Sequence, residues 1–249
     1  MRKAILPFLI CLLYALPNMA QYEEKSNPSG TNFQRDISGG VFWHPRGLGI
    51  NIKTGKRMQS GVWRVLDFDL VSMKHEKERR VRSSSFSAPG SFFYGKLNSV
   101  YIVRAGYGRR WELSTHLYKN TVSSRFQVSV GPSFALLKPV YLEIYYPTPD
   151  NQGGFLVSEK YNPDKHTDPT TIFGNSSFFS GISDTKGRIG VNLKANIQFD
   201  WSDYYDQVQG LELGMVIDAF GREIPILAFA SNKNVFTSLY ICLNIGNSW

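Results

Sequence analysis

Alternation of apolar and polar residues runs through this chain and constrains its fold more than any other feature. The clearest stretch, 188–201, carries Ile189, Val191, Leu193, Ala195, Ile197, Phe199 and Trp201 on one face and Arg188, Asn192, Lys194, Gln198 and Asp200 on the other. Side chains of a strand point alternately to its two faces, so this stretch predicts a β-strand with one apolar and one polar side. Its length exceeds the usual strand of about 5–6 residues and suits a tilted membrane strand of about 9–11 residues with an extension.

The same pattern recurs in seven further segments, so the sequence predicts an all-β protein with eight strands. The segments are 48–52, 66–70, 101–107, 126–130, 141–145, 211–218 and 239–245. No helical period of comparable strength occurs. The count depends on a turn at Lys138–Pro139, without which it becomes odd, and 223–230 could supply another strand.

The first twenty residues read as a cleavable secretory signal peptide. Arg2 and Lys3 precede an apolar run that ends at Leu16, and the small residue Ala20 closes the segment. About 13 apolar residues are too few to cross a bilayer core of roughly 30 Å. We therefore expect a signal peptide over 1–20, a flexible periplasmic leader over 21–36, and one β-domain over 37–249.

The amino-acid composition excludes two further classes of protein. Aromatic residues make up 14% of the chain, which excludes a disordered protein, and no internal stretch approaches the roughly 18 apolar residues of a membrane-spanning helix. The formal charge of +8 becomes +6 without Arg2 and Lys3. The mature chain keeps Cys242 alone, so no internal disulfide can form and the fold itself must hold the domain together.

Alternation alone does not separate a membrane barrel from a soluble β-sandwich. Five tryptophans near the ends of the expected strands favour an aromatic girdle at the membrane interface: Trp43, Trp63, Trp111, Trp201 and Trp249. A final strand that closes on an aromatic residue is likewise typical of outer-membrane barrels. We predict an antiparallel up-and-down transmembrane β-barrel in the outer membrane.

Connection lengths also fit such a barrel. With a periplasmic N-terminus, the outer loops would be 56–62, 111–122, 147–186 and 220–234, and the inner ones 74–98, 138–139 and 201–208. Outer loops of these barrels are longer than their periplasmic turns, and 74–98 is the exception here. The longest connection, 147–186, would be one long extracellular loop.

Four stretches of the chain resemble a known group of proteins. YGKLNSVYIVRAGYGR (94–109), VGPSFALLKPVYLEI (130–144), LELGMVIDAFGREIPILAF (211–229) and NVFTSLYICLNIG (234–246) look like uncharacterised small outer-membrane β-barrel proteins of the Bacteroidota kind. The resemblance covers about 46–246. It implies a localisation and a scaffold, and it carries no site residues or activity.

The polar strand faces predict a charged lumen. An eight-stranded barrel is just wide enough for side chains to fill, so opposite charges inside it should pair. The expected network consists of Asp67, Asp69, Arg104, Arg188, Lys194, Glu212 and Asp218. This predicts a packed lumen without a diffusion pore, and a non-enzymatic envelope protein that needs no cofactor.

Two connections, 74–98 and 147–186, could contact an envelope protein partner. The segment 74–82 contains Lys74, Lys77, Arg79, Arg80 and Arg82, which could bind lipid phosphate, another envelope component or an acidic protein, or could form a solvated turn. The loop 147–186 is rich in aromatic residues and could be a folded cap or a binding surface. Nucleic acid is not an expected partner of an exported protein, and the oligomeric state stays open.

Two alternative functions remain. A lipid-modifying barrel enzyme could use Ser114 as nucleophile and His116 as base, with Glu112 orienting the histidine. A secreted β-sandwich could serve as a soluble binding module. Asp164, His166 and Asp168 alternate in the longest loop, but polar residues are common in loops, and no metal site is predicted.

Overall fold

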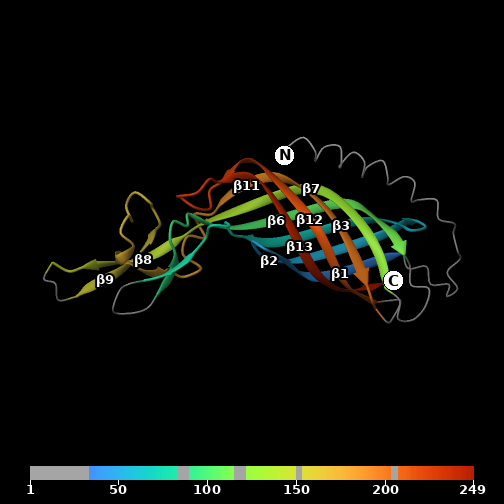
Figure 1. The fold of residues 1–249 in the computed structure, drawn as a ribbon, viewed down its shortest axis with the longest axis horizontal. Helices are drawn as coiled ribbons and strands as arrows, with labels where there is room; N and C mark the ends of the chain where they lie inside the picture. The colour runs from blue at the N-terminus through green and yellow to red at the C-terminus, as the bar shows by residue number, and fades with distance from the viewer. Residues whose placement is uncertain (1–33, 84–89, 115–121, 150–152, 203–206) are drawn as a thin grey trace. The chain divides into compact units, whose positions relative to one another are not determined.

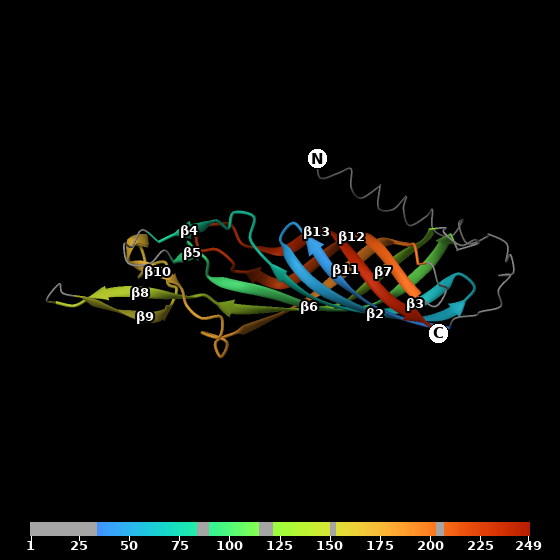
Figure 2. The same cartoon turned by 90° about the horizontal axis from the view of Figure 1, so that it is seen from below.

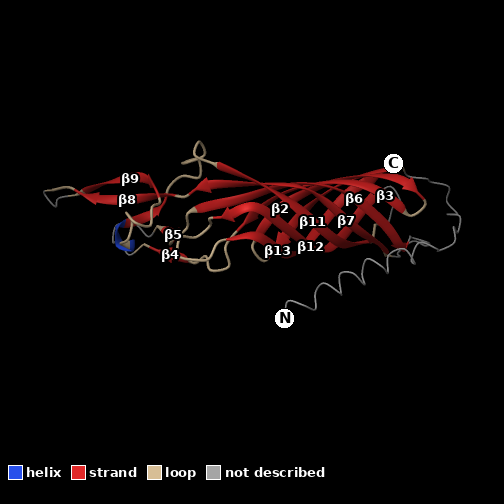
Figure 3. Cartoon of the chain, turned by 90° about the horizontal axis from the view of Figure 1, so that it is seen from above, coloured by secondary structure: helices blue, strands red, loops and turns tan. Residues whose placement is uncertain are grey.

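A computed structural model describes residues 34–83, 90–114, 122–149, 153–202 and 207–249. The expected signal peptide and most of the expected leader lie outside these residues. Eight long strands form the main body (Figure 1 and, coloured by secondary structure, Figure 3). They are β1 (Arg35–His44), β2 (Gly47–Gln59), β3 (Val62–Met73), β6 (Asn98–Ser114), β7 (Ser123–Pro139), β11 (Lys186–Asp200), β12 (Gln207–Ile224) and β13 (Lys233–Ser248).

These strands close into a barrel in the order β1-β13-β12-β11-β7-β6-β3-β2, and every neighbouring pair is antiparallel. The ring closes where β1 pairs with β13, from Asp36 opposite Ser248 to Trp43 opposite Ile241. This confirms the predicted eight-stranded antiparallel up-and-down barrel. In the described part of the chain no helix is long and apolar enough to cross a membrane.

The strand assignment contains two errors: one of the eight expected strands lies outside the barrel, and one barrel strand was not expected. β1 begins at Arg35, inside the expected leader, and was not among the predicted strands. The expected strand 141–145 is instead β8 (Tyr141–Pro147), which pairs outside the barrel. No hairpin turn occurs at Lys138–Pro139, because β7 continues through both residues. One strand was lost and one was added, so the predicted count of eight is right.

The same two errors misplaced three connections. We call the end where β1 begins and β13 finishes the terminal end, and the opposite end the loop end. Since β1 reverses the direction of every later strand up to β7, the connections within 56–62 and 111–122 lie at the terminal end, and 74–98 lies at the loop end. The predicted sides of these three connections relative to 147–186 were wrong. The connections within 147–186, 201–208 and 220–234 keep their predicted ends.

The loop end carries two long connections instead of the single long loop expected (Figure 2). The first contains β4 (Arg80–Arg82) and β5 (Ser91–Phe93), and the second contains β8, β9 (Gly154–Lys160), the 3₁₀ helix Pro169–Thr171 and β10 (Ile172–Asn175). They share one apolar cluster, the loop cluster, formed by Phe92, Leu142, Ile144, Tyr161 and Ile172. Backbone hydrogen bonds from Leu97 to Ile226 (2.9 Å) and from Val140 to Leu97 (3.0 Å) connect these segments to the end of β12.

Two glycines serve identifiable needs of the barrel. Gly61 has a φ of 69° in the tight turn between β2 and β3, a conformation that side-chain-bearing residues rarely adopt. Gly106 on β6 faces the lumen, where a Cβ atom would lie 2.0 Å from Oδ1 of Asp67. The missing side chain therefore leaves room for a buried carboxylate.

Candidate functional site: the barrel lumen and its rims

Compared with a soluble barrel, this barrel has its apolar and polar faces exchanged. Its outward faces are apolar, and Ile189 and Ile245 expose 76% and 72% of their surface. Its inward faces hold buried polar and charged residues, among them Asn51, Lys53 and Gln127. A soluble barrel would bury its apolar face, whereas a transmembrane barrel presents that face to lipid and keeps polar groups inside. The distribution here is that of a transmembrane barrel.

Arg104 lies at the centre of the lumen and crosses it. Its Nε and Nη2 atoms donate to the two carboxylate oxygens of Asp218 at 2.8 and 2.7 Å. Its Nη1 atom lies 3.7 Å from the Asp69 carboxylate on β3. Since β7 and β11 lie between β6 and β12 in the ring, this pair joins two strands that are not neighbours across the lumen.

Two lysines complete the charged core. Lys194 on β11 lies 2.9 Å from Asp69 and 3.6 Å from Asp67. Lys53 on β2 pairs with Glu212 on β12. This core comprises three cations and four carboxylates, all nearly inaccessible to solvent: the connected residues Arg104, Lys194, Asp67, Asp69 and Asp218, and the pair Lys53 and Glu212. We call these seven residues the lumen network.

Neutral groups satisfy much of the remaining hydrogen-bonding capacity. Asp67 accepts from Gln127 Nε2 at 3.0 Å and from Ser129 Oγ at 2.8 Å. Tyr240 donates its hydroxyl to Glu212, and its ring stacks on Phe42 with centroids 4.2 Å apart. Buried charges are stable when they are both paired and hydrogen-bonded, so this network holds the strands of the barrel in register.

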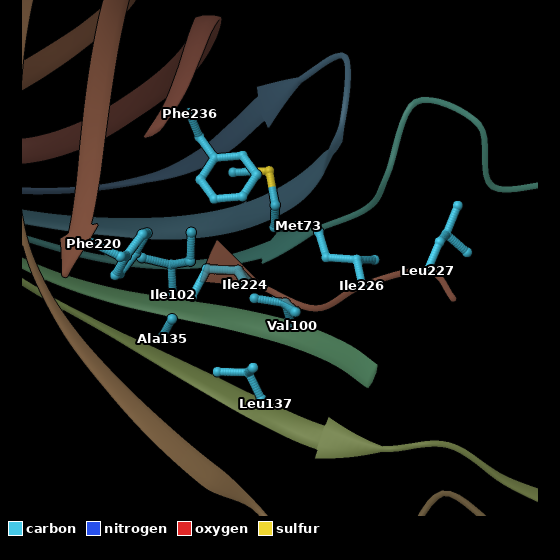
Figure 4. Packing of buried hydrophobic residues seen from close by; sticks show 10 residues of the cluster. All are labelled: Met73, Val100, Ile102, Ala135, Leu137, Phe220, Ile224, Ile226, Leu227 and Phe236. Atoms are coloured by element: carbon cyan, nitrogen blue, oxygen red, sulfur yellow. The ribbon is translucent and has the colours of Figure 1, made fainter. Parts of the chain in front are cut away.

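Towards the loop end the lumen becomes apolar. The layer shown in Figure 4 includes Met73, Ile102, Phe220 and Phe236 from four strands. Its other members are Val100, Ala135, Leu137, Ile224, Ile226 and Leu227. We call these ten residues the apolar layer. Because they are all nearly buried, the inward side chains pack against one another across this level of the barrel.

A second set of ion pairs fills the terminal end of the lumen. Arg110 on β6 pairs with Asp36 on β1, and Arg125 on β7 lies 3.3 Å from Asp200 on β11. The indole Nε1 of Trp63 donates to Glu112 at 2.7 Å. The lumen therefore contains charged pairs at its centre and terminal end and apolar packing at its loop end.

The structure places six of the seven predicted network residues together. Arg188 is the exception: it is half-buried, and its one side-chain hydrogen bond to a described residue goes to the carbonyl of Gly187 at 3.5 Å. Five buried residues of the lumen were not predicted: Lys53, Asp36, Arg110, Tyr240 and Asn244, the last of which donates to Glu212 at 3.1 Å. The signal for Lys53 was present, because it alternates with the outward Ile50 and Ile52, whereas Asp36 lay in the expected leader.

The five tryptophans do not share one environment. Trp43, Trp201 and Trp249 are exposed, and Trp111 is half-buried on the outer face, where it stacks on Phe126. Trp63 is 6% exposed, so its assignment to the membrane interface was wrong. The register of β3 explains this, since Trp63 shares a parity with Asp67 and Asp69, which face the lumen.

The predicted basic segment 74–82 lies at the loop end. Its five cations, Lys74, Lys77, Arg79, Arg80 and Arg82, are exposed and form no ion pair within the residues that the structure describes. Its two acids are paired: Glu76 with Arg46, which lowers the pKa of that carboxyl, and Glu78 with Lys96 at 2.7 Å. The segment borders a cavity of about 610 Å³, lined by Pro45, Arg46, Lys74, His75, Glu76, Glu78, Phe93, Thr237, Ser238 and Leu239.

The residues of the alternative enzyme site are only partly described. His116 lies outside the described residues. Ser114 shares a hydrogen bond with Ser124 across β6 and β7 at 2.9 Å, and Glu112 accepts from Trp63. In the loop considered for metal, Asp168 caps the 3₁₀ helix, and no group of three metal-ligating side chains occurs among the described residues.

Comparison with known proteins gives structural matches of low sequence identity. No protein-family model matches the sequence, and neither does any curated protein. The crystal structure of Neisserial surface protein A has a TM-score of 0.41 at 10% identity, covering 88% of this chain and 98% of that chain. Ail, the attachment invasion locus protein of Yersinia pestis, in complex with the heparin analogue sucrose octasulfate, has a TM-score of 0.40 at 10% identity, covering 88% and 100%. The architecture described above follows from the strand pairing of this chain itself.

Proposed function

We propose that this chain is a non-enzymatic outer-membrane β-barrel protein with a packed lumen, acting as a structural or interaction component of the cell envelope. One observation carries the proposal: the barrel is apolar outside and filled inside by paired charges and an apolar layer. Such a body is stable in a bilayer, and its lumen leaves little room for solutes.

The outer membrane is the proposed location, because the chain combines a spanning barrel with an expected cleavable signal peptide. Fractionation followed by gel electrophoresis of unheated and boiled samples tests this. We expect the protein in the outer-membrane fraction, with a different mobility after boiling. Recovery as a soluble protein without a mobility shift would contradict the proposal and favour a secreted binding module.

The interaction surface is proposed to lie at the loop end. The exposed cations of 74–82 and the aromatic connection 147–186 are both attached there, and the two connections share the loop cluster. Because Glu76 and Glu78 are neutralised by Arg46 and Lys96, the free charge of the basic segment is positive. An acidic envelope component is therefore the proposed partner class.

Crosslinking in intact cells tests this surface. A photoreactive residue at position 79 should capture a partner, and substituting Lys77, Arg80 and Arg82 with Gln should reduce capture. The matched control substitutes Lys56, Arg64 and Arg109, which lie at the terminal end, and should leave capture unchanged. Equal loss in both variants would show that net charge alone is responsible.

A further inference from the structure

Four cations stand side by side on the outer face of the barrel near its terminal end. They are Arg35 on β1, Lys56 on β2, Arg64 on β3 and Arg109 on β6, and all four are exposed. Strand pairing sets Arg35 opposite Lys56, Lys56 opposite Arg64, and Arg64 opposite Arg109. We call this set the cationic row. At about 4.8 Å between strands it extends for roughly 14 Å.

The row has no counter-charge among the residues that the structure describes. No hydrogen bond or ion pair joins its four side chains to a described carboxylate. The inward neighbours behave differently: Arg57 lies 3.9 Å from Glu112, and Arg110 pairs with Asp36. Like charges placed directly opposite on neighbouring strands destabilise a sheet, so an anion supplied from beyond the described residues would stabilise the row.

The surroundings of the row are apolar. The next outward residues towards the barrel centre include Ile37, Leu66 and Tyr107, and those towards the terminal end include Met58 and Trp111. In the terminal-end halves of β7, β11, β12 and β13, the described outward residues include no Lys or Arg. The row is therefore a local feature of half the barrel, placed at the margin of the lipid-facing surface.

We propose that the cationic row binds the phosphate groups of anionic phospholipids in the leaflet nearer the terminal end. The inference rests on the proposed membrane location. Cations next to a membrane surface attract anionic headgroups, and long Lys and Arg side chains lay their stems along apolar surface while the charged group reaches the interface. Because strands tilt in a barrel, the row is inclined to the membrane plane. The long, flexible Lys and Arg side chains compensate for this tilt and let the four charged groups reach a common depth.

Native mass spectrometry of the purified barrel in detergent micelles, with phosphatidylglycerol or phosphatidylcholine added, tests this site. Wild-type protein should retain phosphatidylglycerol in preference to phosphatidylcholine. The variant R35Q/K56Q/R64Q/R109Q should lose this preference by at least tenfold, since each cation near a surface contributes roughly fivefold. The matched control K74Q/K77Q/R79Q/R80Q removes the same number of charges at the loop end and should keep the preference for phosphatidylglycerol.

Three outcomes would overturn the inference: a row variant that still prefers phosphatidylglycerol, a control that loses the preference equally, or displacement of the lipid by equimolar inorganic phosphate. The gel mobility of each variant before and after boiling shows separately whether its barrel is folded. A folded barrel without lipid preference contradicts the row, whereas a soluble chain contradicts the membrane location. If the quadruple variant fails to fold, the pairs R35Q/K56Q and R64Q/R109Q replace it, each expected to show a partial loss.

Discussion

Arg104 and Asp218 meet inside the lumen from two strands that are not neighbours, and form a bidentate ion pair at 2.8 and 2.7 Å. Both side chains are inaccessible to solvent, and Ser133 adds a hydrogen bond to the same carboxylate at 3.2 Å. A planar guanidinium matched to a carboxylate fixes geometry as well as charge. The pair therefore fixes the separation and register of two strands that share no backbone contact.

Removing one partner of this pair should strongly destabilise the barrel. We expect Asp218→Ala to lower the free energy of unfolding by about 3–5 kcal/mol, because it leaves the Arg104 guanidinium buried with a weaker partner. Urea titration of the folded barrel in detergent, followed by the mobility shift on gels, measures this. The double variant R104M/D218L should recover much of the loss, and a double variant as unstable as the single one would contradict the explanation.

The lumen should not conduct ions. The lumen network occupies its centre and the apolar layer closes its loop end, so we expect purified protein in planar bilayers to give no stable conductance steps. Large, long-lived channels would show that the inward side chains rearrange in the bilayer. The variant F220A/F236A, which removes two large side chains of the apolar layer, tests whether that layer contributes to the seal.

Trp63 should respond differently to lipid from the other tryptophans. In single-tryptophan variants reconstituted with brominated lipid, fluorescence of Trp201 should be quenched, since that side chain is 47% exposed on the outer face. Fluorescence of Trp63 should persist, because the indole is buried and donates to Glu112. Trp63→Phe should also destabilise the barrel by about 1.5–3 kcal/mol, the usual value of a hydrogen bond to a charged group. Equal quenching at both positions would contradict the inward orientation.

Cys242 should report on barrel folding. Its thiol is 1% exposed and lies 3.4 Å from Asn244 Oδ1 in the lumen. In the mature chain from residue 21, we expect a maleimide reagent to leave the folded barrel unmodified and to label it fully in urea. Rapid labelling without urea would mean that the lumen opens to solutes of that size.

The second long connection should be dispensable for the barrel. Since β7 ends at Pro139 and β11 begins at Lys186, replacing 141–184 with a short Gly-Ser linker leaves all eight barrel strands intact. We expect the variant to keep its heat-dependent mobility shift while losing partner capture at the loop end. Loss of the shift would show that the loop cluster contributes to barrel stability.

Periodicity identified strands reliably but not the sheets to which they belong. In β8, Leu142 and Ile144 alternate with exposed or half-buried neighbours as a barrel strand would require, yet they are buried in the loop cluster. In β1, Gly39 and Gly40 interrupt the apolar pattern, and the strand begins within a polar leader, so no strand was assigned there. A period of two reports that one face is buried and does not report what buries it.

Most of the candidate site followed from the same periodicity. Strand parity placed Asp67, Asp69 and Arg104 on inward faces, and the structure shows which groups they meet. Pairing across the barrel could not be predicted, because it depends on strand order and stagger, which set the neighbour of each inward side chain. The inward position of Trp63 shows the opposite failure, since residue type was given more weight there than parity.

The pairing of β1 with β13 carries a consequence for assembly. Every other neighbouring pair in the ring joins strands that follow one another along the barrel, so seven of the eight seams can form as hairpins. The last seam unites residues about 210 positions apart, such as Asp36 and Ser248, so it forms only after β13 has been synthesised. Until then the sheet has two open edges, each a template for pairing with another chain. Closure of this seam therefore removes both edges, and with them the site at which another copy of the chain could pair.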